Sequence, residues 1–264
     1  MSTLIPDQGY PRAAAVSPRL QVAQSTGSTN DDVVAHASAD PANWPHLSVL
    51  LTQDQRKGRG RMGREWIGPP GTSLAVSVLL RVPAIPVAVR GWVPLAAGVA
   101  LAYAIENQLA GSSHVVGLKW PNDILIDGEK IAGILTETVP GHPDAVVVGS
   151  GINTRMSVPP VPGATSFLLL GQKSDDDQLL ADYLSALDDS LNTLIQASGD
   201  VQNSGLHASV SSYCLTLGRE VRVALPGGRN VVGEAARLDA DGRLVLQTAN
   251  GETAVAAGDV LHLR

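Results

Sequence analysis

The segment "GLKWPNDILIDGEKIAGIL", residues 117–135, decides the fold class of this chain. It contains short apolar runs separated by tight polar turns, a spacing typical of antiparallel strands joined by hairpins. A further apolar run, "AVVVGSGI" at residues 145–152, follows after another polar turn. We therefore predict a mixed or antiparallel sheet in the middle of the chain.

Patterns on both sides of this segment add strands and helices. Residues 47–53, "LSVLLTQ", are typical of a buried strand, and residues 72–82, "TSLAVSVLLRV", alternate like a second strand. Residues 90–110 predict a long, mostly apolar helix against the sheet, with Pro94 in its first turn. An amphipathic helix opened by acids is predicted at residues 175–197. The fold class is α+β.

The two ends of the chain differ from this central part. Residues 1–19 are rich in proline, alanine and serine and predict an irregular lead-in, after which Ser28 should cap a helix with Asp31 three residues later. Near the C-terminus, short alternating strands are separated by Pro-Gly-Gly, Asp-Gly and Asn-Gly turns, which is typical of a small separate β-barrel. We predict a main domain at 20–216 and this barrel at 217–264.

Composition narrows the class of protein. The 264 residues, 44% of them apolar, suffice for one sizeable core and a small second domain. The net charge of −6 argues against a surface adapted as a whole to nucleic acid. No uninterrupted apolar run approaches the roughly 18 residues of a membrane span, and no secretory signal pattern is present, so we expect a cytoplasmic protein with no membrane partner. Because Cys214 is the only cysteine, an internal disulfide and a cysteine-rich zinc site are excluded.

A strongly basic segment, "RKGRGRMGREW" at residues 56–66, departs from the acidic average. It contains the spacing G-x-G-x-x-G, but a dinucleotide-binding loop must open a helix and be followed by an acid about 20 residues later. Here Pro-Pro-Gly at 69–71 prevents a useful helix, and the next acid after Glu65 is Glu106. The dinucleotide interpretation is therefore rejected. The arginines can still bind an anion, because guanidinium groups match carboxylate and phosphate oxygens.

Six short motifs, taken together, resemble the biotin protein ligases. In family order they are "STN" at 28–30, Q-x-x-GRGRxGR-x-W at 55–66, "KWPND" at 119–123, "KIAGIL" at 130–135, "GSGIN" at 149–153 and "ATS" at 164–166. Each motif is weak alone, but the ordered set is specific. The resemblance implies a catalytic domain related to class II aminoacyl-tRNA synthetases and lipoate ligases, followed by an SH3-like domain.

The resemblance also implies a reaction in two steps. Biotin and ATP give biotinyl-5′-AMP and pyrophosphate, and a lysine of a biotin carboxyl carrier domain of a carboxylase then takes the biotin. The implied small molecules are biotin, ATP and Mg²⁺, and no specific nucleic acid is expected. Because no cluster of His, Asp and Glu has metal-ligand spacing, we predict no metal-binding residues and expect Mg²⁺ to arrive with ATP.

Roles follow by matching the family motifs position by position. The implied catalytic cations are Arg61, Arg64 and Lys130. The implied biotin-binding residues are Ser28, Thr29, Gln55, Gly58, Arg59, Arg61, Lys130, Gly133 and Gly149. The implied ATP or adenylate residues are Arg61, Arg64, Trp66, Lys119, Asn122, Asp123, Asn153 and Ala164, with Trp66 as the aromatic on which adenine stacks.

Two alternatives remain open. A lipoate or octanoate ligase has the same fold, but an apolar acyl chain does not need Ser28, Thr29 and Gln55 at one end of its site. A biotin-responsive DNA-binding regulator is disfavoured, because only 27 residues precede Ser28, too few for an N-terminal winged helix. For the ligase, we expect the basic segment to be mobile without ligand and to fold over the adenylate.

Overall fold

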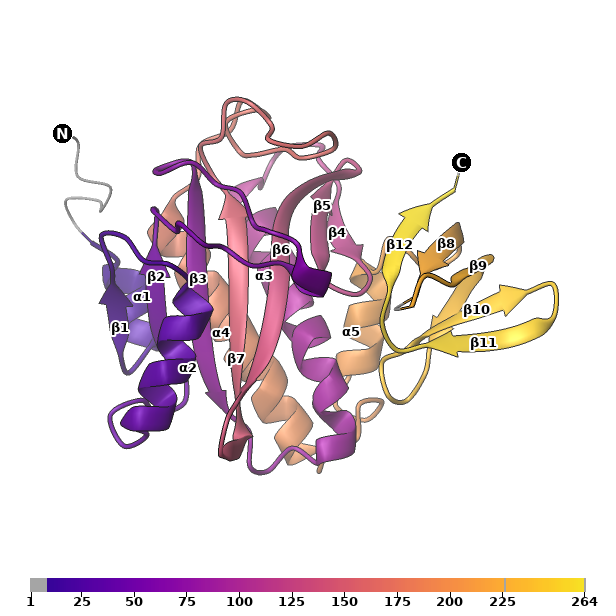
Figure 1. Cartoon of the computed structure of the whole chain (residues 1–264), viewed down its shortest axis with the longest axis horizontal. Coiled ribbons are helices and arrows are strands. Elements are labelled where there is room, and N and C mark those ends of the chain that lie inside the picture. Colours follow the sequence, from indigo (N-terminus) through magenta and orange to yellow (C-terminus); the bar gives the residue numbers. More distant parts are fainter. Residues whose placement is uncertain (1–8, 226, 264) are drawn as a thin grey trace.

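The computed structural model describes residues 9–225 and 227–263. Its larger part is built on a seven-stranded sheet with strand order β1-β2-β3-β7-β6-β5-β4 (Figure 1). The strands are β1 (Leu20–Val22), β2 (Ser48–Thr52), β3 (Ser73–Arg81), β4 (Val116–Lys119), β5 (Asp123–Ile126), β6 (Glu129–Val139) and β7 (His142–Asn153). β1 runs parallel to β2, and the remaining neighbours pair antiparallel. The predicted mixed sheet is confirmed.

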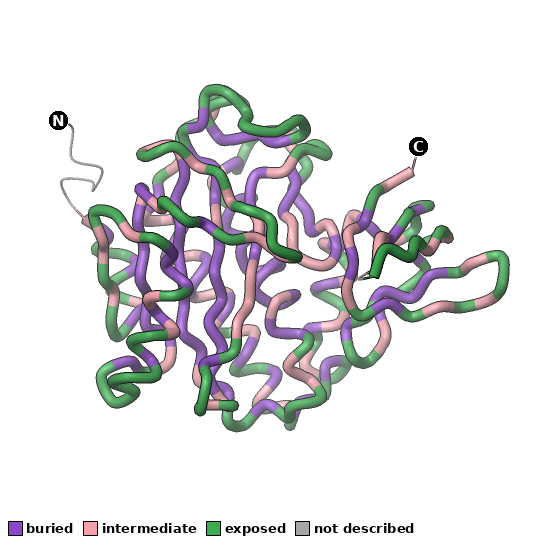
Figure 2. Tube along the Cα trace, viewed as in Figure 1, coloured by how far each residue is buried: buried purple, intermediate pink, exposed green. Residues whose placement is uncertain are grey.

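Helices cover both faces of this sheet. α2 (Thr29–Ala39) lies in front of it in Figure 1, and α3 (Val93–Gln108) and α4 (Asp176–Gln196) lie behind it. The central strands are consequently buried along most of their length (Figure 2). β3 is a strand as predicted, but it is buried on both faces up to Arg81 instead of alternating, because α2 covers the face that an alternating pattern would leave to solvent.

The predicted helix signals correspond to real helix starts. Ser28 is the N-cap of α2, and its hydroxyl accepts a hydrogen bond from the Asp31 N–H. Pro94 lies in the first turn of α3, which follows a 3₁₀ segment at Val87–Trp92. The combined helical stretch Val87–Gln108 is long and apolar enough to cross a membrane by length and composition alone. However, α3 packs against α4 and against strands β4, β5 and β6, and it forms part of the main core.

The predicted irregular lead-in is wrong at residues 11–16, because Pro11–Val16 forms helix α1. Residues 1–8 lie outside the described residues. No side chain next to α1 caps it, but Asp177 of α4 accepts hydrogen bonds from the N–H groups of Arg12 (3.1 Å) and Ala13 (3.0 Å). The helix is therefore stabilised by a cap that is distant in sequence, which local patterns cannot reveal.

The C-terminal part is a five-stranded antiparallel sheet with strand order β11-β10-β9-β8-β12. Its strands are β8 (Glu220–Ala224), β9 (Asn230–Leu238), β10 (Leu244–Thr248), β11 (Gly251–Val255) and β12 (Asp259–His262). The short strands predicted there are confirmed. Helix α5 (Leu206–Tyr213), which was not predicted, precedes this sheet.

Two buried tryptophans of the larger part hydrogen-bond to the turn between β9 and β10. The indole of Trp92 donates to the Ala240 carbonyl at 2.8 Å, and that of Trp120 donates to the Gly242 carbonyl at 3.1 Å. Because indole N–H groups need an acceptor when they are buried, these bonds favour one placement of the small sheet against the large one.

A hydrogen-bonded chain of three residues also joins the two parts. The Trp120 N–H donates to the Thr216 hydroxyl at 3.0 Å, and that oxygen lies 3.1 Å from Nε2 of His262 on β12. Burial, with the nearby charges of Lys119 and Arg219, lowers the pKa of His262 to about 4. The imidazole is therefore neutral at neutral pH and can accept a hydrogen bond from the Thr216 hydroxyl.

Candidate active site

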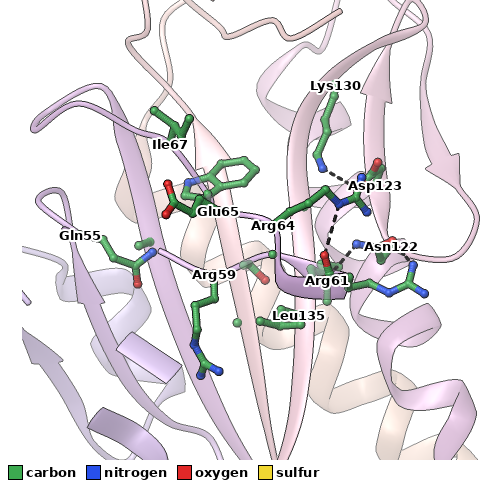
Figure 3. Close-up of a pocket in the computed structure, with 18 of the residues that line it drawn as sticks. Gln55, Arg59, Arg61, Arg64, Glu65, Ile67, Asn122, Asp123, Lys130 and Leu135 are labelled. Carbon is green, nitrogen blue, oxygen red and sulfur yellow. Dashed lines mark hydrogen bonds and ion pairs between the residues drawn. The ribbon is translucent and has the colours of Figure 1, made fainter. Parts of the chain in front are cut away.

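A pocket of about 360 Å³ lies between the large sheet, the start of α2 and the loop at 53–72 (Figure 3). All but two of the residues assigned to the site from sequence line it. Those residues are Ser28, Thr29, Gln55, Arg59, Arg61, Arg64, Trp66, Asn122, Asp123, Lys130, Gly133, Gly149, Asn153 and Ala164. The motifs that are scattered along the chain thus meet at one cavity of small-molecule size.

Gly58 and Lys119 are the two assigned residues outside the pocket lining. A Cβ at Gly58 would lie 2.6 Å from the carbonyl oxygen of Trp66, so glycine allows the two limbs of the basic segment to pack together. Lys119 ends β4 beside Asp123, and burial lowers the pKa of its ammonium group. Both residues therefore lie beside residues that line the pocket, Trp66 and Asp123.

The polar end of the pocket is formed by the start of α2 and by Gln55. The Gln55 side-chain oxygen accepts hydrogen bonds from the N–H of Thr29 (2.9 Å) and from its hydroxyl (3.1 Å). This arrangement fixes the amide orientation and leaves the Gln55 NH₂ group as a donor. Ser28 caps α2 at the same place. The helix start therefore carries short donors and acceptors into this end of the cavity.

Asn30 is a buried polar residue of this region that the sequence analysis did not assign. Its side-chain oxygen accepts from the Ser77 hydroxyl at 2.6 Å, and its NH₂ group donates to the Leu135 carbonyl (3.2 Å) and to Glu137 Oε2 (2.8 Å). A Cβ at Gly149 would lie 2.2 Å from that oxygen. Gly149 is therefore required to make room for Asn30. Asn30 is the third residue of the "STN" motif, but its burial becomes visible only in the structure.

Trp66 lies across glycines of β6 and β7. A Cβ at Gly151 would lie 2.3 Å from the indole ring, and one at Gly133 would lie 3.4 Å from it. The buried indole N–H has no hydrogen-bond partner among the described residues. The Lys130 ammonium lies 5.7 Å from the ring centroid. Gly151 was quoted within "GSGIN" but not assigned a role, and its need for space becomes visible only when the position of Trp66 is known.

The three predicted catalytic cations each have a partner within the protein. Lys130 Nζ lies 2.6 Å from Asp123 Oδ1, and Arg61 donates to Asn122 Oδ1 at 2.8 Å (Figure 3). Arg64 pairs at 2.6 Å with Asp259. Burial lowers the pKa of Arg61, although a guanidinium remains charged in proteins.

The C-terminal sheet thus contributes directly to the surroundings of the site. Asp259 begins β12, and the neighbouring Gly258 carbonyl lies 3.5 Å from a guanidinium nitrogen of Arg61. Neither contact can be predicted from the sequence, because each joins residues almost 200 positions apart. No local spacing indicates such a contact.

The Arg59 side chain points away from the other two arginines (Figure 3). Its guanidinium pairs with Asp31 of α2 and, at 2.7 Å, with Glu137 of β6. Arg59 still lines the pocket. The structure therefore separates Arg59, which is bound to the main domain, from Arg61 and Arg64, which contact the C-terminal sheet.

The far wall of the pocket is the proline-rich stretch after β7. Pro160, Val161 and Ala164 line the cavity. The Lys130 N–H donates to the Gly163 carbonyl at 2.7 Å, so this stretch is attached to the start of β6. Within residues 9–225 and 227–263, no group of three or more His, Cys, Asp or Glu side chains is placed to hold a metal ion.

Comparison with known proteins agrees with this arrangement. Residues 22–153 match the biotin/lipoate A/B protein ligase family, and residues 216–263 match the biotin protein ligase C-terminal domain. The chain is 40% identical to a biotin–[acetyl-CoA-carboxylase] ligase of Mycobacterium tuberculosis, over 93% of this chain and 90% of the relative. It is 29% identical to the bifunctional ligase/repressor BirA of Bacillus subtilis, over 83% of this chain and 67% of that protein.

The similarity extends to three dimensions. The structure of the biotin protein ligase from Aquifex aeolicus in complex with biotin and ATP has a TM-score of 0.76 and 25% identity, covering 93% of this chain and 99% of that one. The family models, the relative at 40% identity and this fold lead to the same assignment. The chain belongs to the biotin/lipoate A/B protein ligase family and, within it, to the biotin protein ligases.

Proposed function

We infer that this chain is an ATP-dependent biotin–[acetyl-CoA-carboxylase] ligase, which forms biotinyl-5′-AMP and transfers its biotin to a lysine of a carrier protein. The observation that carries this conclusion is the 40% identity to a ligase of that name over 93% of the chain. The pocket supports it, because it collects polar, aromatic and cationic residues in one cavity of suitable size.

For biotin, we propose that the ureido ring binds at the start of α2. Ser28, Thr29 and the free NH₂ group of Gln55 supply short polar partners, and the main chain of Arg59 closes this end. We assign the main chain of Gly133 and Gly149 to biotin because both glycines line the pocket, whereas Gly58 lets the two limbs of the loop pack together. A buried ureido group needs such partners, because an unpaired polar group costs about 1–3 kcal/mol.

For ATP, we propose that adenine stacks on the ring of Trp66. Gly133 and Gly151 leave room for this ring against the sheet. The remaining adenylate contacts are assigned to polar or small residues around that ring. They are Lys119, Asn122, Asp123, Asn153 and Ala164. Mg²⁺ is proposed to arrive with ATP, since no group of three or more His, Cys, Asp or Glu side chains among the described residues is placed to hold a metal ion.

In the first step, a biotin carboxylate oxygen bonds to the α-phosphorus, and the bond from that phosphorus to the pyrophosphate oxygen breaks. Two like charges at 4 Å repel by about 4 kcal/mol at an effective dielectric of 20. Arg61, Arg64 and Lys130 are proposed to offset this repulsion and to stabilise the charge that develops in the transition state. Each would exchange its present protein partner for a phosphate oxygen.

In the second step, the amine of the carrier lysine attacks the acyl carbon of the adenylate. The amide bond forms, AMP leaves with the electron pair of the anhydride bond, and the amine loses a proton. The protein that accepts biotin is a carrier domain of a biotin-dependent carboxylase. We propose that residues 56–66 fold over the adenylate and shield it from water until this domain arrives.

The finer description of the fold is also a proposal. We propose that residues 20–216 share the class II aminoacyl-tRNA synthetase fold and that 217–264 form an SH3-like barrel. The mixed seven-stranded sheet and the antiparallel five-stranded sheet support this division. We further propose a cytoplasmic location and no sequence-specific DNA binding. A salt-resistant, sequence-selective shift of duplex DNA in a gel would contradict the latter.

The substrate assignment is tested by pyrophosphate exchange into ATP with biotin, lipoate or octanoate as the acid. We expect exchange with biotin and rates at least about 100-fold lower with the other two, because they leave the ureido partners unpaired. Equal rates with lipoate would favour a lipoate ligase, the alternative that the family description leaves open.

A further inference from the structure

A single carboxylate beside the pocket connects its two polar walls. β6 places Gly133, Leu135 and Glu137 at alternate positions, and the first two line the pocket. Glu137 Oε2 accepts hydrogen bonds from the Arg59 guanidinium at 2.7 Å and from the Asn30 NH₂ group at 2.8 Å. One oxygen atom is therefore shared by the basic segment and by helix α2.

Glu137 is the better protected of the two acids that bind Arg59. Its side chain is 27% exposed, whereas that of Asp31 is 61% exposed. Ion pairs lose most of their strength at exposed sites, and charge-assisted hydrogen bonds keep more of theirs where water is partly excluded. The Glu137 contact should therefore dominate in holding Arg59.

The second contact of Glu137 leads to the polar end of the pocket. Asn30 accepts from the Ser77 hydroxyl, which lies 2.8 Å from the Thr29 hydroxyl. Thr29 in turn donates to Gln55. A change at Glu137 therefore alters the hydrogen bonding of Arg59 in the loop and of Asn30, which is linked through Ser77 to Thr29.

We propose that Glu137 is a positioning residue for biotin: its carboxylate fixes Arg59 and Asn30 together, so that the Arg59 main chain and the Thr29–Gln55 pair face the ligand in one arrangement. The identity of the ligand rests on the proposed function, whereas the anchoring of the loop does not. The negative charge of the carboxylate strengthens its hydrogen bond with the Arg59 guanidinium. Because one oxygen accepts from both partners, removing the side chain beyond Cβ removes both contacts at once.

The anchoring is tested on the ligand-free enzyme by limited trypsin digestion, since residues 56–66 contain five cleavage sites. Glu137→Ala should speed cleavage within this segment about fivefold or more, because a loosened loop samples the open form more often. Glu129→Ala, which removes an exposed acid on the same strand, should leave the rate unchanged. Cleavage fragments are identified by mass spectrometry, and equal rates in the two variants would overturn the anchor.

The consequence for biotin is measured by calorimetric titration without ATP. Glu137→Ala should weaken biotin binding about tenfold, with kcat at saturating substrates changed less than about twofold. Combining it with Arg59→Ala should cost less than the sum of the single effects, because the two residues act through one contact. Faster cleavage with unchanged biotin affinity would overturn the positioning role. Failure of the wild-type enzyme to bind biotin would overturn the proposed function and leave the anchor standing.

Discussion

The two halves of the basic segment differ in the contacts that hold their arginines. In the first half, at 56–60, main-chain N–H groups of Arg56 and Lys57 donate to carbonyls just before α2, and Arg59 binds acids of α2 and β6. In the second half, at 61–66, Arg64 pairs with Asp259 at the start of β12, and Arg61 donates to Asn122 of the main domain and to the Gly258 carbonyl before β12.

This difference separates a fixed half from an exchangeable half. The first half combines main-chain bonds with a partly buried ion pair, so its conformation is set by the main domain. In the second half, the Arg64–Asp259 pair is exposed, with 58% and 39% of the side chains accessible. Exposed pairs contribute only about 0–1 kcal/mol, so a phosphate can replace Asp259 at little cost. We infer that the first half shapes the biotin end of the pocket and that the arginines of the second half change partners when ATP binds.

The largest expected effect concerns Lys130, at the ATP end. Lys130→Ala should slow biotinyl-AMP formation by about a hundredfold or more, since it removes a charge that stabilises the transition state. Single-turnover formation of the adenylate is the measurement, and Lys173→Ala, an exposed lysine, is the control. Normal adenylate formation in Lys130→Ala would remove this residue from catalysis.

Substitutions at two glycines of β7 test the biotin end and the ATP end of the pocket separately. Gly149→Ala would press on Asn30, and Gly151→Ala would press on the Trp66 ring. We expect the first change to raise the Kd for biotin by about tenfold or more and the second to raise the KM for ATP by a similar factor, by overpacking costs of about 1–3 kcal/mol. Calorimetry and exchange kinetics measure these two constants. Equal damage to both ligands in both variants would contradict the division.

A change of intermediate size is expected for Arg61→Gly, which removes a contact of the second half with Asn122 and Gly258. Release of biotinyl-AMP should be about tenfold faster, because the loop loses a cation that pairs with the adenylate phosphate. Labelling of serum albumin in the presence of biotin and ATP should rise accordingly. Unchanged off-rate and unchanged albumin labelling would show that this arginine does not retain the intermediate.

The smallest expected effect is that of Asp259→Asn. Loss of the exposed pair with Arg64 should change the KM for ATP by no more than about two- to threefold, and high salt should abolish even that difference. Glu252→Gln breaks a comparable exposed pair on β11, away from the pocket, and provides the control. A tenfold effect of Asp259→Asn that survives high salt would make the second half as firmly fixed as the first.

The sequence predicted those features that depend on neighbouring residues or on motif order. The α2 start at Ser28, the long helix containing Pro94 and the strands around residues 117–135 follow from local pattern, and the structure confirms them. Most of the assigned site residues also meet in one pocket. Their individual roles stay predictions.

The missed features depend on contacts between distant residues. Glu137 looks like an ordinary strand acid until the structure brings it to Asn30 and Arg59. Asp259 gives no local sign that it reaches Arg64. Helix α1 has no cap from a neighbouring side chain, and Asp177 of α4 caps it instead. In each case the deciding partner lies many residues away, where spacing rules have no information.

The neutral imidazole of His262 makes the connection between the two sheets sensitive to acid. Its pKa of about 4 in the folded protein lies below the ordinary value of 6.5, so the unfolded chain takes up this proton first as the pH falls. The stabilising contribution is complete above about pH 6.5 and is lost progressively down to about pH 4. Mild acid should therefore destabilise the packing of β12 against the larger sheet. Because Asp259 lies on the same strand, its contact with Arg64 in the loop should weaken as well. Denaturant unfolding of wild type and His262→Asn across this interval measures the effect, and identical pH profiles would exclude it.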